Sequence, residues 1–131
     1  MNGLILVDKP QGITSFGVAA RLRRIYGTKK VGHTGTLDPM ATGLLPVFVG
    51  YSTKLCSFVL EADKEYIAGI KLGLTTDTLD ITGKVLSSSN NFPSDKEFKA
   101  ACESFVGSYY QMPPMFSAIK KDGQKLYDLA R

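Results

Sequence analysis

The hydrophobic positions of this chain fall into short blocks whose spacing predicts strands and helices in alternation. Residues 4–7 are a continuous apolar run that ends at a polar turn with proline and glycine, a pattern typical of a buried strand. Apolar side chains at Val18, Leu22 and Ile25 recur at helical spacing, after a hydroxyl residue at 14 or 15 that can cap a helix. We therefore expect a strand over residues 4–7 and a helix from about residue 15 to residue 26.

The middle of the chain repeats this order. Residues 44–49 are strand-like, but Pro46 cannot donate to a ladder, so we expect an edge strand or an irregular start. A serine or threonine at position 52 or 53 can cap a short helix that runs to residue 60. Residues 64–72 alternate between apolar and polar positions, with Tyr66 at the start of the apolar face, which predicts a further strand.

The second half of the chain has turn signals and one clear helix start. Residues 73–83 are rich in threonine and aspartate, which predicts a polar loop, and a strand resumes at residues 84–86. Ser94 and Glu97 form a capping box for a core-packing helix that ends near Gly107. Beyond it the patterns predict an extended stretch over 109–116, a strand over 117–120, a turn at 122–123 and a helix from residue 125.

Length and composition restrict the class of protein. The chain has 131 residues, 44% of them hydrophobic, which suits one soluble α+β domain or part of one. Cys56 and Cys102 lie far apart and the chain has one histidine, so we expect no metal site and two buried, reduced thiols in a cytoplasmic protein, with a disulfide between them left open. No apolar run approaches the roughly 20 residues of a membrane span, which predicts no membrane association.

The segment from residue 33 to residue 43 is the strongest candidate for chemistry. Gly35 and Gly43 enclose it, and Pro39 pushes Asp38 out of the helical region, so the carboxylate should project from an extended or turn backbone. His33, the one histidine, lies next to it. Two interpretations stay open from these residues alone: a catalytic loop and an Asp-Pro turn that reverses the chain.

Basic residues are densest in the predicted first helix and just after it. Arg21, Arg23, Arg24, Lys29 and Lys30 form this cluster, in a chain of net charge +4. Such a cluster fits contacts with phosphate groups, which need cations but no fixed geometry. It equally fits a solvated helix face.

Six segments resemble, in the same order, motifs of the TruB family of bacterial tRNA pseudouridine-55 synthases. They are residues 6–15 (LVDKPQGITS), 32–46 (GHTGTLDPMATGLLP), 64–66 (KEY), 73–83 (GLTTDTLDITG), 111–120 (QMPPMFSAIK) and 123–131. The match covers essentially the whole chain in the right order, which makes the resemblance specific.

The resemblance implies a fold and a reaction. The fold is α+β, a mixed, mainly antiparallel sheet flanked by helices, of which residues 1–131 are the N-terminal portion of the catalytic domain. The reaction isomerises one uridine of the tRNA T-loop to pseudouridine without cofactor or metal: the C–N glycosidic bond breaks, the uracil rotates and a bond forms through C5. The partner is the T-stem-loop of tRNA, and the full-length protein is expected to be a cytoplasmic monomer.

The resemblance also assigns residues. Asp38 is the essential residue of the catalytic motif, Tyr66 lies against the target base and His33 meets the RNA. The expected substrate-binding set is Tyr66, His33, Lys9, Pro10, Gly35 and Thr36, with Lys9 and Pro10 in the motif that supports the loop. The expected contacts with the RNA backbone are Arg21, Arg24, Lys29, Lys30 and Lys64.

Several alternatives remain. The chain could be a non-catalytic RNA-binding module with the basic helix as its footprint. An aspartyl-phosphate enzyme would place its aspartate before Thr-Gly-Thr, whereas Asp38 follows that sequence, and a two-carboxylate glycosidase would need Asp77 or Asp80 as its second acid. Whether Asp38 attacks C6 of the base, attacks C1′ of the sugar or removes a proton stays open. Since the family's arginine partner of the aspartate lies outside residues 1–131, we expect this chain alone to be inactive or nearly so.

Overall fold

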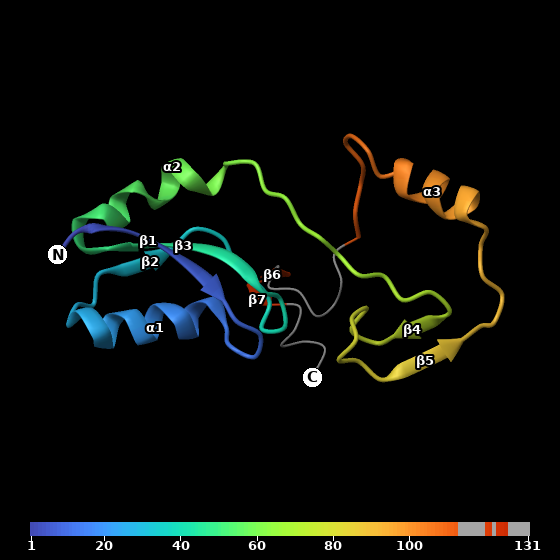
Figure 1. Ribbon diagram of the computed structural model, residues 1–131, viewed down its shortest axis with the longest axis horizontal. Coiled ribbons are helices and arrows are strands. Elements are labelled where there is room, and N and C mark those ends of the chain that lie inside the picture. The colour runs from blue at the N-terminus through green and yellow to red at the C-terminus, as the bar shows by residue number, and fades with distance from the viewer. Residues whose placement is uncertain (113–119, 122, 126–131) are drawn as a thin grey trace. The chain divides into compact units, whose positions relative to one another are not determined.

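A three-stranded antiparallel sheet is the centre of the first part of the chain. In the computed structural model, which describes residues 1–112, 120–121 and 123–125, the strands are β1 (Gly3–Lys9), β2 (Val31–His33) and β3 (Gly43–Val49). Their order is β1-β3-β2, so β3 is the central strand, with Ile5 and His33 both opposite Val47 (Figure 1).

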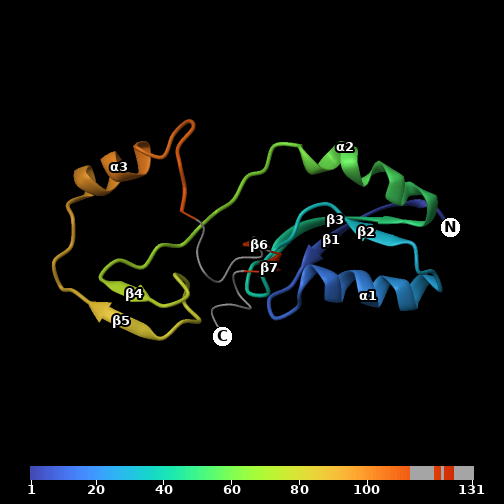
Figure 2. The same cartoon turned by 180° about the vertical axis from the view of Figure 1, so that it is seen from behind.

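Helices lie on both sides of this sheet. Figures 1 and 2 show the sheet between α1 (Ser15–Tyr26) and the pair formed by the 3-10 helix η1 (Gly50–Leu55) and α2 (Cys56–Leu60). The core lies under α1. Its buried apolar residues are Val18, Ala19, Val31, Leu45, Val47 and Val49.

Alternation along the strands decides which side chains reach this core. Leu45 is 1% exposed while its neighbour Leu44 is 64% exposed, because successive side chains of a strand point to opposite faces. The expectation of a uniformly buried strand over residues 4–7 was wrong for this reason. Ile5 and Val7 pack against the core, but Leu4 and Leu6 are exposed on the face opposite α1.

The boundaries of α1 agree with the sequence-based prediction. The Thr14 hydroxyl oxygen accepts from the Gly17 N–H at 2.9 Å, and Gly27 ends the helix with a φ of 60°, a left-handed conformation that glycine adopts readily. One face assignment was wrong. Ile25 is exposed, and Tyr26, four residues after Leu22, packs against the core in its place.

Pro46 sits in the central strand, which corrects the expectation of an edge strand. The N–H and C=O of a residue in an antiparallel strand point to the same side, and the Pro46 carbonyl accepts from the Thr34 N–H at 3.1 Å, just beyond the end of β2. The N–H group that Pro46 lacks would therefore point toward the end of the short strand β2. The ladder with β1, where Pro46 pairs with Leu6, loses no bond.

The short helix after β3 begins differently from the prediction. Neither Ser52 nor Thr53 caps it. The Thr53 hydroxyl donates instead to the Gly50 carbonyl, and the turn starts as a 3-10 helix directly at the end of β3.

The predicted strand over residues 64–72 is not formed in the part of the chain that the structure describes. These residues are extended but pair with no other described strand, and all are exposed. A strand needs a neighbour for its backbone groups, and a periodic sequence does not supply one.

Residues 67–131 form a second unit. It contains the antiparallel pair β4 (Leu74–Thr76) and β5 (Val85–Ser88), the helix α3 (Asp95–Glu103) and the hairpin β6 (Lys120–Lys121) and β7 (Gln124–Lys125). The polar loop expected over residues 73–83 thus contains the short strand β4 near its start. Lys125, expected to start a helix, lies in β7. The remaining predictions on residues 113–119, 122 and 126–131 lie outside the described residues.

The capping box of α3 is confirmed, but its core-packing role is not. The Ser94 N–H donates to Glu97 Oε2 at 2.8 Å, and the Glu97 N–H donates to the Ser94 hydroxyl at 3.4 Å. Of the apolar stripe, Phe98 is half-buried, while Phe105, just beyond the end of the helix, and Cys102 are exposed. Both cysteines are free thiols, but the expectation that both are buried was wrong, because Cys102 is exposed and Cys56 is half-buried. This partial burial raises the pKa of the Cys56 thiol.

The predicted α+β class is confirmed. All strand pairings among the described residues are antiparallel, so the mixed part of the expected sheet is not seen there. Within the same residues, no helix combines the length and the apolar character that crossing a membrane requires.

The alternation of β3 generates a stability prediction. Leu45→Ala should lower the free energy of unfolding by about 2–5 kcal/mol, because it leaves a cavity under α1. Leu44→Ala, at an exposed residue on the opposite face of β3, should cost no more than about 1 kcal/mol. Urea denaturation followed by circular dichroism measures both, and equal losses would contradict the assigned faces.

Candidate active site

Two loops meet at one end of the three-stranded sheet. β1 ends at Lys9, opposite Gly43 at the start of β3, so the turn after β1 and the loop over residues 34–42 leave the sheet side by side. The Gly12 N–H donates to the Pro39 carbonyl at 2.7 Å and ties the two loops together. Gly12 has a φ of 87°, which explains a glycine at this turn.

Asp38 lies in the second loop, with its backbone held on both sides. On one side, the Ser15 hydroxyl accepts from the Leu37 N–H at 2.9 Å and lies 3.2 Å from the Leu37 carbonyl, to which it donates. On the other, the Ala41 N–H donates to the Asp38 carbonyl at 3.0 Å, closing a turn over Pro39. The Asp38 side chain is exposed, and no described residue forms a hydrogen bond or ion pair with its carboxylate.

Lys9 is fully buried (0% exposed) directly behind these loops. Its ammonium donates to the carbonyls of Pro10, Ile13 and Pro39, at 3.1, 2.8 and 3.3 Å. An ammonium is tolerated in such a place only when its donors are satisfied, and here three backbone carbonyls do this. The structure therefore favours a supporting role for Lys9 over direct contact with a ligand. Pro10, the next residue, is exposed.

His33 ends β2 on the approach to Asp38. Its Nδ1–H donates to the Gly35 carbonyl at 2.6 Å, which fixes the ring and leaves Nε2 for another partner. The side chain is half-buried, and Thr36, between Gly35 and the Asp38 turn, is exposed. The structure thus gathers the expected residues His33, Gly35, Thr36 and Asp38 in one loop.

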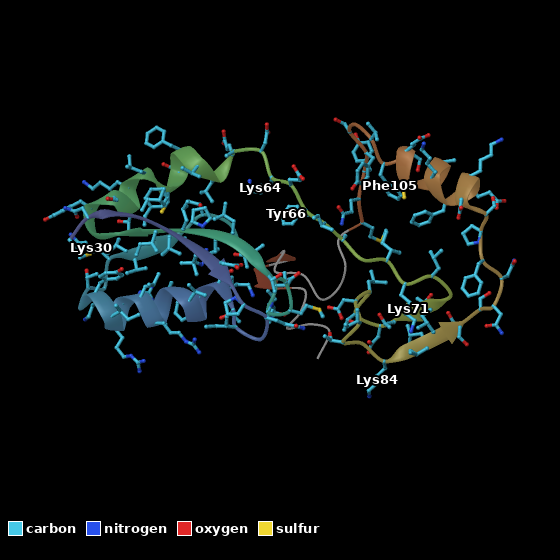
Figure 3. All side chains as sticks on the ribbon, viewed as in Figure 1. Lys30, Lys64, Tyr66, Lys71, Lys84 and Phe105 are labelled. Atoms are coloured by element: carbon cyan, nitrogen blue, oxygen red, sulfur yellow. The ribbon has the colours of Figure 1, made fainter. Side chains whose placement is uncertain are left out.

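Tyr66 and Lys64 lie on the extended segment after α2 (Figure 3). Tyr66 is 67% exposed, and no described hydrogen bond joins it to the Asp38 loop. The Lys64 ammonium donates to the carbonyls of Leu60 and Ala62, both at 2.8 Å, and so satisfies the end of α2. The structure does not bring Tyr66 and Asp38 together by any described contact.

The basic cluster lies toward the other end of the sheet. Ser15, beside Leu37, begins α1, and Arg24 comes nine residues later, about 14 Å along the helix axis. Arg21 and Arg24 are exposed on α1. The Lys30 ammonium lies 4.1 Å from the ring centroid of Tyr51 (Figure 3 labels Lys30).

Arg23 differs from its neighbours in the cluster. Its guanidinium donates to the Val31 carbonyl at 3.2 Å and lies 5.1 Å from the centroid of the Phe16 ring. These contacts anchor the arginine to its own sheet and helix, so Arg23 is less available to a partner than Arg21 or Arg24.

Two residues of the site were missed from the sequence. Ser15 was predicted only as an alternative cap, and Gly12 only as part of a turn, yet both bond directly to the Asp38 loop. The one sequence signal was the adjacent pair Thr14 and Ser15. Because one hydroxyl is enough to cap the helix, the other is available for a different role.

A second acidic turn lies between β4 and β5. Asp80 Oδ1 accepts from the hydroxyls of Thr78 and Thr82 and from the Thr82 N–H. Hydrogen bonds from Thr82, and then from Thr78, lower the pKa of Asp80. Asp77 Oδ1 accepts from the Lys84 N–H, so both acids are used within their own turn. No described cluster of three histidines, cysteines or acids could hold a metal ion.

The fold and the loop geometry define an α+β protein with an aspartate-bearing loop, and comparison with known proteins extends this. A chain in the crystal structure of a Cbf5-Nop10-Gar1 complex matches 90% of this chain and 31% of its own length, with a TM-score of 0.60 and 26% identity. The model of the TruB family pseudouridylate synthase N-terminal domain matches residues 23–131. The chain belongs to the TruB family.

Curated relatives agree along the whole chain. The tRNA pseudouridine synthase B of Syntrophotalea carbinolica is 52% identical over an alignment of 132 positions that covers 100% of this chain and 43% of the relative. That of Clostridium tetani is 54% identical over 132 residues and is matched over 46% of its length. The chain thus spans less than half the length of these relatives.

The burial of Lys9 generates a prediction. Lys9→Met should lower the free energy of unfolding by about 1–3 kcal/mol, because carbonyls of both loops lose their donor inside the protein. Lys29→Met, at an exposed lysine, should change it by no more than about 0.5 kcal/mol. Urea denaturation of the two variants checks this, and a neutral Lys9→Met would contradict the supporting role.

The Asp80 turn generates a prediction about pH. Since the folded pKa of Asp80 is lowered, its stabilisation of the turn is present above a pH of about 4 and is lost as the pH falls through the lowered pKa. Thr82→Val removes the largest cause and should raise the pKa of Asp80 toward its ordinary value. Thr75→Val, which removes a hydroxyl with no described bond to Asp80, should not. An NMR titration of the carboxyl carbon measures both.

Proposed function

We propose that residues 1–131 are the N-terminal portion of the catalytic domain of an enzyme that isomerises uridine to pseudouridine at position 55 in the T-loop of tRNA. The observation that carries this proposal is the exposed carboxylate of Asp38 on a backbone held from both sides. Membership of the TruB family supports it. The remainder of the catalytic domain and a C-terminal RNA-binding module would follow in the longer protein.

The chemistry suits a fixed carboxylate. In the isomerisation the bond between C1′ and N1 breaks and one between C1′ and C5 forms, while C5 loses a proton and N1 gains one, so no atom enters from outside. A carboxylate can act as nucleophile or base. We assign this role to Asp38, with no cofactor or metal.

The RNA must present its base to this carboxylate. A uridine inside a folded loop has to be extruded, which costs a few kcal/mol, and stacking on an aromatic ring returns part of this. Tyr66, with its exposed ring, supplies the stacking surface once the longer protein positions it, and His33 meets the rearranged loop with its free Nε2. Gly35, Thr36 and Pro10 form the adjoining surface, and Lys9 holds that surface from behind.

The basic cluster would contact RNA at a distance from the target base. Four cations of this cluster are exposed: Arg21, Arg24, Lys29 and Lys30. The length of β3 alone puts the two ends of the sheet about 20 Å apart. These cations therefore suit phosphates of the adjoining stem. The Lys64 ammonium already donates to carbonyls at the end of α2, so its contact with RNA would be the weakest of the set. The partner is the T-stem-loop, and the full-length enzyme is a cytoplasmic monomer.

The test compares this chain with a chimera that joins residues 1–131 to the remaining part of the Clostridium tetani relative. The chimera should form pseudouridine in a T-stem-loop RNA, while residues 1–131 alone should show little or no turnover. In the chimera, Asp38→Asn should lower kcat by at least about 100-fold and keep RNA binding, since the amide is neither nucleophile nor base. Asp95→Asn, at an exposed aspartate of α3, is the matched control.

Two outcomes would overturn the proposal. One is an Asp38→Asn chimera that retains turnover. The other is a chimera that binds the RNA but never forms pseudouridine, which would favour a non-catalytic RNA-binding module. Pseudouridine is measured by release of tritium from RNA labelled at C5 of uridine.

A further inference from the structure

The Ser15 hydroxyl is one of the few buried polar side chains in the first unit. It is 1% exposed and belongs to the first residue of α1. Its two hydrogen bonds go to one residue far along the chain, the N–H and the C=O of Leu37. One hydroxyl thereby satisfies both backbone groups of the residue before Asp38.

This hydroxyl is not needed by its own helix. The N-cap of α1 is Thr14, whose exposed hydroxyl accepts from the Gly17 N–H at 2.9 Å. A second hydroxyl directly after the cap contributes nothing further to the helix start. The two adjacent hydroxyls therefore have separate tasks: that of Thr14 stabilises the helix, and that of Ser15 holds the loop.

We propose that Ser15 is a positioning residue for Asp38, a role that rests on the proposed function. The Leu37 C=O and the Asp38 N–H belong to one planar peptide group, so the bond from Ser15 to that carbonyl fixes the plane before Asp38. The Ala41 N–H holds the Asp38 carbonyl and thus the plane after it. With both planes fixed, φ and ψ of Asp38 are fixed, and with them the direction of the bond from Cα to Cβ.

The site accepts few substitutes for serine. Alanine keeps the shape but leaves the Leu37 N–H and C=O without this partner. Cysteine is of similar size but is a weaker donor and acceptor. Both variants leave the Thr14 cap in place. Thr14→Ala is the matched control, because it removes the neighbouring hydroxyl and weakens α1 without touching Leu37.

The first measurement uses the 131-residue chain and does not depend on the proposed function. In Ser15→Ala, the Leu37 amide should exchange with deuterium about tenfold faster than in the parent chain, relative to the amides of β3, because its acceptor is lost. In Thr14→Ala this ratio should stay unchanged. Equal protection of Leu37 in the parent chain and Ser15→Ala would overturn the proposal.

The second measurement uses the full-length chimera. Ser15→Ala should lower kcat by about 100-fold with little change in KM, because a misplaced carboxylate slows the chemical step more than RNA binding. The kcat of Ser15→Cys should lie between those of the parent chimera and Ser15→Ala. Ser15→Cys takes the place of Ser15→Ala if the alanine variant fails to fold. Thr14→Ala, even if equally destabilised, should keep kcat.

The outcomes separate the two proposals. A parent chimera that binds the RNA but shows no turnover overturns the proposed function, whatever the exchange of Leu37 shows. An active parent chimera whose Ser15→Ala and Ser15→Cys variants keep kcat overturns the positioning role of Ser15 alone. A loss of activity in Thr14→Ala as large as that in Ser15→Ala would do the same, because general loosening of α1 would then explain both.

Discussion

Three groups from outside the Asp38 loop form hydrogen bonds with backbone groups of residues 37–39. They are Lys9 Nζ, the Gly12 N–H and the Ser15 hydroxyl. The loop around Asp38 has no regular secondary structure, so these bonds replace the ones that a helix or strand would give its backbone. The ammonium of Lys9 is the most demanding of the three, because a buried charge without partners is costly. Its three carbonyls connect the two loops, so the carboxylate depends on residues that never approach it.

This dependence explains why the sequence predicted some parts of the site and not others. The turn at Asp38-Pro39 follows from the local restriction that proline places on the preceding residue, and the ends of α1 follow from Thr14 and Gly27. The burial of Lys9 and the bonds of Ser15 do not follow from local rules. Both arise from the register of β1 against β3, which brings together segments more than 20 residues apart.

The errors in the strands have the same origin. Pro46 was expected at an edge because proline lacks a donor, yet it is tolerated in the centre, where the donor would face the end of β2. Residues 64–72 have the alternation of a strand but no partner within the described residues. Periodicity reports which side chains can share a face, whereas strand formation depends on a neighbouring strand that is often distant in sequence. The TruB motifs added what periodicity lacked, because their order along the chain predicts a catalytic role for Asp38.

The Asp38 carboxylate and the basic cluster lie toward opposite ends of the three-stranded sheet. The exposed carboxylate of Asp38 follows Leu37, which is bonded to Ser15 at the start of α1. Arg24 lies nine residues after Ser15, about 14 Å along the helix axis, and Lys29 and Lys30 come after the helix ends. At such a distance in salt the cations act only weakly on the carboxylate, since the screening length is about 8–10 Å. They can therefore attract a polyanion without neutralising the acid. In the proposed function, the sheet and α1 would set the spacing between the nucleotide at Asp38 and the phosphates held by the cluster, so the core under α1 would contribute indirectly to substrate recognition.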